Sequence, residues 1–218
     1  MKIAILAESA ADRAAVQILA GHILGVPIEN VEPSLEARGW PSVRNILPVV
    51  LRELHYHLEA DGLIVVADAN GSVPHVAAHE EAEEDHCRLC QLRKIIRTEK
   101  TRLTPVPAKP AIKTAVGLAM PAIEAWWRCG LEVNATESAW LQSFKSARDS
   151  KPARLKLKRD VYGTDRPSLE METRRMGEEA RRLCEDVSSL EKNFPHGFGS
   201  LARDLRSWQI SRTCGQPS

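Results

Sequence analysis

The opening of the chain alternates between a short apolar run and a helical pattern. The segment from Lys2 to Ala7 is almost continuously apolar, which predicts a strand buried on both faces of a parallel sheet. Ser9 can then cap a helix, and Asp12 can reach back to complete the cap. Apolar residues recur at helical spacing up to Gly25, where this helix is predicted to end. The first elements are therefore a strand, a sharp turn and a helix.

The following segments repeat this alternation. A short strand is predicted over residues 26–31, and a helix over residues 41–59, where a proline occupies the first turn. A turn at Asp61-Gly62 then leads into residues 63–67, which form the most strand-like run of the chain. A polar segment that begins at Asp68 closes this strand.

Helical patterns dominate the remainder. Residues 79–102 are strongly charged, acidic first and basic later, and this order predicts a helix whose charges suit its dipole. After a linker with three prolines, residues 112–120 predict another strand, and Pro121 opens a helix that carries Glu124. Beyond Gly130 the pattern is helical.

Strands that alternate with helices predict an α/β fold with a mostly parallel, Rossmann-like sheet flanked by helices. We expect residues 1–130 to form this α/β domain. Residues 131–212 should form a helical extension packed on it, with breaks at 162–167 and 194–197, and residues 213–218 a frayed tail.

Composition and charge narrow the class of protein. A chain of 218 residues can bury a large core without disulfides, and its net charge of +1 leaves nucleic-acid binding to a local patch. The apolar start is too short for a signal peptide and meets Glu8, and no segment approaches the roughly 18 apolar residues of a membrane span. Five scattered cysteines do not suggest a disulfide framework. We expect a soluble, cytoplasmic protein with reduced thiols and no membrane partner.

Three acidic residues follow the predicted strands. Glu8 comes after the first strand, Asp68 after the strand at 63–67, and Glu124 in the first helical turn after the strand at 112–120. Because parallel strands end at one edge of a sheet, these carboxylates should face the same edge. Clustered carboxylates repel one another unless a cation lies among them, and oxygen ligands suit Mg²⁺ or Mn²⁺. Taken singly, each acid is equally compatible with a helix cap or a solvated loop.

These residues resemble the signature of Toprim-fold proteins, which carry a Glu after the first strand and Asp-x-Asp after a later one. The matching segments are Leu6-Ala-Glu8 and Ile64-Val-Val-Ala-Asp68-Ala-Asn70. Within that superfamily the chain is most similar to an uncharacterised family related to the OLD-type nucleases, through Pro121-Ala-Ile-Glu-Ala-Trp126 and a helix at 198–208. The resemblance covers most of the chain. The chain departs from the pattern at Ser9, where glycine is usual, and at Asn70, which replaces the second acid.

The resemblance implies a Mg²⁺-dependent or Mn²⁺-dependent nuclease that cleaves nucleic-acid phosphodiesters, most naturally of DNA. Asp68, Asn70 and Glu124 would hold the metal, and Glu8 would be a general acid/base or a second-metal ligand. Residues 83–85 could supply a further ligand. It also implies antiviral defence against phage or mobile DNA, beside an ATPase partner.

Two other functions stay open at this point. The neutral Asn70 is compatible with a catalytically degenerate Toprim-like module that binds a partner protein such as an ATPase. The same sheet edge would also suit a small-molecule phosphoryl-transfer enzyme. A homo-oligomer is compatible with each of these functions.

A basic segment at residues 145–159 could contact a phosphate backbone. The cations in its second half are the candidate nucleic-acid ligands: Lys151, Arg154, Lys156, Lys158 and Arg159. The simpler alternative is that these residues form a solvated helix face.

Cys87 and Cys90 suggest half of a zinc site, with His79 one or two helical turns away. No second Cys-x-x-Cys follows, so we favour helix residues with incidental thiols. Trp126 and Trp127 are adjacent on a predicted helix, so one can be buried while the other faces a partner.

Overall fold

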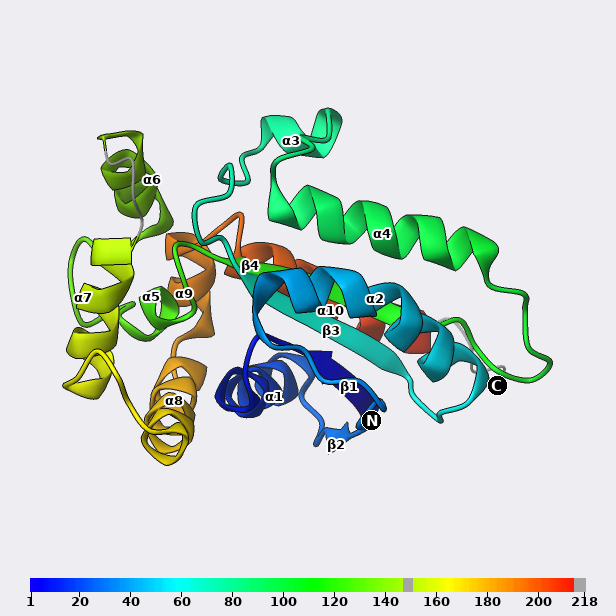
Figure 1. The fold of residues 1–218 in the computed structure, drawn as a ribbon. Helices are drawn as coiled ribbons and strands as arrows, with labels where there is room; N and C mark the ends of the chain where they lie inside the picture. The colour runs from blue at the N-terminus through cyan, green and yellow to red at the C-terminus, as the bar shows by residue number, and fades with distance from the viewer. Residues whose placement is uncertain (147–150, 214–218) are drawn as a thin grey trace.

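The computed structural model describes residues 1–146 and 151–213 and confirms an α/β fold (Figure 1). Its sheet has four strands, all parallel, in the order β2-β1-β3-β4. This arrangement is Rossmann-like, as the alternation of strands and helices predicts. The strands are β1 (Lys2–Leu6), β2 (Glu29–Asn30), β3 (Gly62–Asp68) and β4 (Lys113–Ala119).

Every residue of β3 from Gly62 to Ala67 is buried. Since successive side chains point to opposite faces, the strand is covered on both faces. Ile64 and Val66 belong to one hydrophobic cluster, whereas Leu63 and Val65 belong to another on the opposite face. The continuous apolar run in the sequence reflects this double coverage.

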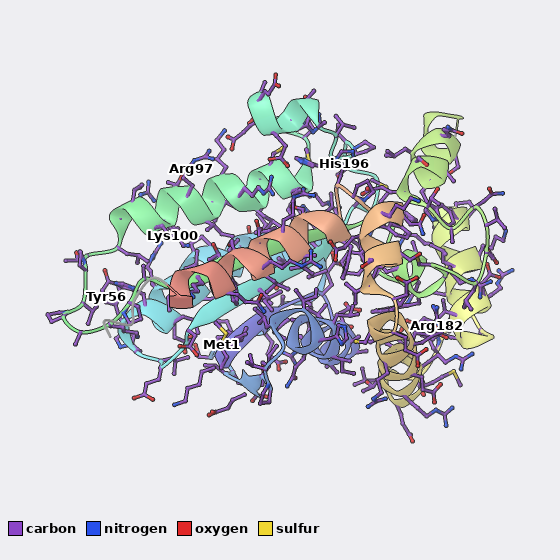
Figure 2. The ribbon with its side chains drawn as sticks, turned by 180° about the vertical axis from the view of Figure 1, so that it is seen from behind. Met1, Tyr56, Arg97, Lys100, Arg182 and His196 are labelled. Carbon is purple, nitrogen blue, oxygen red and sulfur yellow. The ribbon has the colours of Figure 1, made fainter. Side chains whose placement is uncertain are left out.

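Two pairs of helices cover the two faces of the sheet. Helices α1 (Ala10–Leu24) and α10 (Phe198–Thr213) share the first cluster, while α2 (Gly39–Tyr56) and α4 (Arg88–Arg102) share the second. Figure 2 shows α10 lying along the sheet from the side opposite to that of Figure 1. The predicted cap of α1 is confirmed: the Ser9 hydroxyl accepts a hydrogen bond from the Asp12 amide at 3.1 Å, and Gly25 ends the helix with φ 64°.

The remaining helices gather beyond the carboxyl ends of the strands (Figure 1). Between α7 and α8 the chain breaks at residues 163–168, one residue after the predicted 162–167, and before α10 it breaks at residues 194–197, as predicted. The short helix α3 (Ala78–Glu81) lies in the connection between β3 and α4. The group comprises α5 (Glu124–Trp127), α6 (Glu137–Ser146), α7 (Lys151–Tyr162), α8 (Leu169–Cys184) and α9 (Val187–Asn193).

The C-terminal helices share one core with the sheet. The ring of Trp126 packs edge-on against Phe198 of α10, with 5.2 Å between centroids. Helix α10 also satisfies the outer edge of β4, where the Asp204 carboxylate accepts a hydrogen bond from the Val116 amide at 3.0 Å. Trp126 and Trp127 are both 0% exposed, so both belong to the core and neither faces a partner. They lie in a single-turn helix that packs against α7 and α8, and Trp126 also contacts Phe198 of α10.

The single helix predicted over residues 79–102 is wrong. Helix α3 ends at Glu81, and α4 begins only at Arg88. The intervening segment folds back along α4, where Glu83 forms an ion pair with Arg97 at 2.8 Å. Residues 14 positions apart in one continuous helix would lie about 21 Å apart, so this pair requires the break.

Other boundaries differ by a few residues. The strand predicted at 26–31 is reduced to the two residues of β2, which are both exposed. Helix α10 continues to Thr213, the first residue of the predicted frayed tail, and residues 214–218 lie outside the described part of the chain. Among the described residues, no helix is both long and apolar enough to cross a membrane.

A buried carboxyl group joins α6 to the turn before α10. Glu137 is 5% exposed, and its Oε2 accepts a hydrogen bond from the His196 amide at 2.8 Å. Burial raises the pKa of Glu137 from 4.5 to about 7, against the lowering effect of the backbone amides of His196 and Gly197.

This raised pKa predicts a pH-dependent contribution to stability. Between pH 4.5 and pH 7 the folded state holds a proton on Glu137 that the unfolded state has released, so stability falls as pH rises through this window. Glu137→Gln keeps the group neutral and should gain about 2 kcal/mol relative to the wild type between pH 5 and pH 8. Urea denaturation of both proteins across this range measures the change, and parallel stability curves would contradict it.

Candidate metal centre

The three predicted acids lie around the carboxyl edge of the sheet. Glu8 follows β1 by two residues, Asp68 is the final residue of β3, and Glu124 is the first residue of α5 after β4. Each is positioned by the end of a different parallel strand, so the sheet itself brings them to one edge.

Two backbone hydrogen bonds interlock these segments. The Asp68 amide donates to Glu8 Oε1 at 3.0 Å, and the Ile123 amide donates to Asp68 Oδ1 at 2.9 Å. The Glu8 side chain is thereby fixed against the end of β3, and the Asp68 side chain against the residue that precedes Glu124. In both hydrogen bonds a main-chain amide of one segment fixes a carboxylate of another segment.

Burial and the nearby carboxylates disfavour the charged forms of Glu8 and Asp68. Burial raises the pKa of Asp68 well above its usual range, and the nearby carboxylates of Glu8, Glu124 and Asp12 raise it further. Burial also raises the pKa of Glu8, although the Asp68 amide and the cations Arg88 and Arg154 oppose this rise. A bound cation would stabilise all of these carboxylates in their ionised form.

Asp12 is a member of this cluster that the sequence analysis treated only as a capping residue. Burial raises its pKa to about 7, and Glu124 and Glu8 add to the shift against the lowering effect of the Ser9 hydroxyl. The signal was present in the sequence, because Asp12 lies one helical turn after Glu8 in the helix that starts at the same sheet edge.

Three cationic side chains surround the acids. Arg88 Nη1 donates to the Asp68 carbonyl at 2.6 Å, and its guanidinium lies 4.7 Å from the centre of the Trp40 ring. Arg154 Nη2 lies 3.7 Å from Asp68 Oδ2, and Lys158 Nζ lies 3.6 Å from Glu124 Oε1. The side chains of Arg154 and Lys158 are 32% and 27% exposed, so they form a rim between the carboxylates and solvent.

The five cations predicted to bind nucleic acid therefore occupy two environments. Arg154 and Lys158 face the acids, and Lys158 also donates to Glu172 Oε1 at 3.1 Å. Lys151, Lys156 and Arg159 are exposed on the same helix, α7, where Arg159 lies 3.5 Å from an aspartate. Of the wider basic segment, residues 147–150, which include Arg148, lie outside the described part of the chain.

Asn70 is placed beside the acids by its backbone. Its amide donates to the Pro121 carbonyl at 3.0 Å, and its carbonyl accepts from Arg88 Nη2 at 3.4 Å. It adopts a left-handed conformation with φ 45°, which asparagine tolerates better than most residues. Within the described residues, its side-chain amide makes no hydrogen bond.

Residues 83–85 do not supply a further ligand at this edge. Glu83 pairs with Arg97, and Asp85 pairs with Lys94 at 3.1 Å, both on the solvent side of α4. The break between α3 and α4 directs these acids along that helix.

The donor set of the acid cluster fits a hard divalent cation. Glu8, Asp68, Asp12 and Glu124 offer only carboxylate oxygens, the ligands that Mg²⁺ and Mn²⁺ prefer. Burial and the neighbouring acids raise the pKa values of Glu8, Asp12 and Asp68, and a divalent ion would favour the ionised forms of these three groups.

Comparison of the chain with models of known protein families, with curated proteins and with solved structures found no match.

Proposed function

We propose that this protein is a Toprim-like, Mg²⁺-dependent or Mn²⁺-dependent nuclease that cleaves nucleic-acid phosphodiesters. The observation that carries the proposal is the meeting of Glu8, Asp68 and Glu124 at one sheet edge, beneath a rim of cations. Acidic residues that hold a metal and basic residues that hold phosphate are the two components that phosphodiester hydrolysis requires.

Each acid has a distinct task in this proposal. Asp68 and Glu124 hold the cation, with Asn70 as a neutral oxygen donor. When bound, the metal supplies charge neutralisation at the phosphate and orients the attacking water. Glu8 accepts the proton of that water, a task suited to a carboxylate whose raised pKa increases its basicity.

The cations would position the nucleic acid. Arg154 and Lys158 would contact the phosphate next to the metal, and the exposed Lys151, Lys156 and Arg159 would follow the backbone away from it. From the resemblance we further propose DNA as the substrate, defence against phage or mobile DNA as the role, and an ATPase as a partner. The free thiols among the described cysteines support action in the cytoplasm.

The test is cleavage of plasmid DNA and of RNA with Mg²⁺ or Mn²⁺. Glu8→Gln and Asp68→Asn should each lower the cleavage rate about 100-fold or more, because each removes a group that acts on the reacting phosphate or water. Glu59→Gln is the matched control, since Glu59 lies near the opposite ends of the strands, pairs with Lys2 and has a side chain that is 88% exposed.

The alternative is a catalytically degenerate module that binds a partner protein. It is favoured by the cations that already pair with Asp68 and Glu124, and by the neutral Asn70. Calorimetry with Mn²⁺ separates the two functions. A wild-type protein that neither binds Mn²⁺ nor cleaves DNA or RNA would refute the nuclease and leave the module.

A further inference from the structure

A second group of metal-binding side chains lies away from the acid cluster, where the connection between β3 and α4 returns to the sheet. It comprises His75, His79, Cys87 and Cys90. One ligand atom of each residue lies within 4.8 Å of one from every other residue of the group. The two cysteines are at the start of α4, and the two histidines come from the loop and from helix α3.

The distances within this group match tetrahedral coordination. His75 Nδ1 lies 3.5 Å from Cys87 Sγ and 3.6 Å from Cys90 Sγ. A zinc ion with Zn–S and Zn–N bonds of about 2.3 and 2.0 Å separates adjacent sulfur and nitrogen ligands by about 3.5 Å. Hydrogen bonding alone explains the group less well, because a neutral imidazole nitrogen has one lone pair for two thiols.

Three of the four side chains are buried, and His79 is partly exposed. His75 is 3% exposed, Cys87 is 0% and Cys90 is 4%. His79 Nδ1 is also buried and has no hydrogen-bond partner among the described residues. Leaving such a nitrogen unpaired costs roughly 1–3 kcal/mol, which coordination to a metal would offset.

A carboxylate orients His75 from behind. His75 Nε2 lies 3.0 Å from Glu80 Oε1, and Arg93 Nη1 donates to both oxygens of Glu80 at 2.9 and 2.8 Å. Glu80 therefore accepts the Nε2 proton and leaves the Nδ1 lone pair directed at the thiols. Metal-binding histidines in proteins usually have this kind of support.

We propose that His75, His79, Cys87 and Cys90 bind one structural zinc ion. Two thiolates and two imidazoles select zinc rather than the hard cation expected at the acid cluster. Four protein ligands complete a tetrahedron, so the ion has no open position for catalysis. The proposal of a zinc site does not depend on the proposed nuclease activity.

The zinc ion would fix the long connection between β3 and α4. Arg88 directly follows Cys87 and donates to the carbonyl of Asp68, so the ion is linked by one residue to the acid cluster. On its other side, His196 lies with its ring 6.2 Å from that of His75, in the turn before α10 (Figure 2). The ion would thus hold the loop and α3 against the start of α4, beside the turn that contains His196.

The sequence analysis identifies three of the four residues of this site. Cys87, Cys90 and His79 suggest zinc in the sequence, but the absence of a second Cys-x-x-Cys argues against it, and His75 lies outside the helix expected over residues 79–102. The spacing His75-x₃-His79-x₇-Cys87-x₂-Cys90 becomes a complete ligand set only when the chain breaks between α3 and α4.

The metal content of the purified full chain tests the site. Protein prepared without a histidine tag, under reducing conditions and with zinc in the growth medium, should carry ~1 zinc per chain by mass spectrometry. Cys87→Ser and His75→Ala should each lower this to below ~0.1. Cys184→Ser is the control, because Cys184 is a free thiol outside the group and should leave the zinc content unchanged. Asp68→Asn should also keep its zinc, which separates this proposal from the nuclease.

Cobalt substitution tests the site in the wild-type protein, so its result holds even if the variants fail to fold. Wild-type protein loaded with Co²⁺ should show thiolate-to-cobalt charge transfer and the strong visible bands of tetrahedral coordination. Wild-type protein that contains no zinc and gives only the weak spectrum of octahedral Co²⁺ would overturn the proposal. Zinc that remains bound in both Cys87→Ser and His75→Ala would also overturn it.

Discussion

Replacing Gly197 with alanine is expected to lower the free energy of unfolding by about 3 kcal/mol or more. A Cβ at this position would lie 2.1 Å from the Leu118 carbonyl oxygen and 3.1 Å from Glu137 Oε1. The Leu118 carbonyl belongs to the backbone of β4 and cannot move without distorting the sheet. The start of α10 would therefore be pushed away from the strand that it covers. Urea denaturation at constant pH measures the loss.

Gly199→Ala is the matched control in the same turn. Its Cβ would have no neighbour closer than 3.4 Å, which is ordinary van der Waals contact. Alanine is also the better helix former by up to about 1 kcal/mol, so this variant should be neutral or more stable. Equal losses in the two variants would show that close approach to β4 is not the cause.

Replacing Trp126 with alanine should cost about 3–5 kcal/mol, because it removes a large side chain that is 0% exposed. The indole contacts Phe198 and lies 3.5 Å from the position of a Cβ on Gly117, so it fills the space between β4 and α10. It also follows Glu124 by two residues in α5, so the cavity would loosen the support of that carboxylate. Thermal and urea unfolding provide the measurement.

Two further substitutions serve as controls for the loss of stability expected in Trp126→Ala. Val133→Ala should change stability by less than about 0.5 kcal/mol, because Val133 is 96% exposed. Trp126→Phe should cost less than Trp126→Ala, since it leaves a smaller cavity and removes an indole nitrogen that has no partner among the described residues. A loss near zero for Trp126→Ala would contradict the shared core of α5 and α10.

The parts of the fold that could be predicted are those with a local signal. The apolar runs of β1 and β3 predict buried parallel strands because each run is covered on both faces. The acids at their ends follow from strand direction alone, since parallel strands terminate together. Glu8 and Asp68 were therefore identifiable before any contact between them was known.

The partners of these acids carry no comparable signal. Arg88 and Arg154 reach Asp68 from two helices that are far apart in the sequence, and only tertiary packing brings them together. His75 joins Cys87 only because acidic residues between α3 and α4 fold back along the helix instead of extending it. Local charge order predicts a regular helix there, whereas the structure breaks the helix between α3 and α4 and pairs Glu83 with Arg97.

The pairing of α10 with β4 has a consequence for synthesis of the protein. The hydrogen bond from the Val116 amide to the Asp204 carboxylate joins residues that are 88 positions apart in the sequence. Helices α10 and α1 bury the same face of the sheet. During translation the four strands are complete long before the helix that shields this face has left the ribosome. The nascent chain therefore carries an uncovered apolar surface for several seconds at ordinary elongation rates, an interval in which chaperones would find a natural binding site.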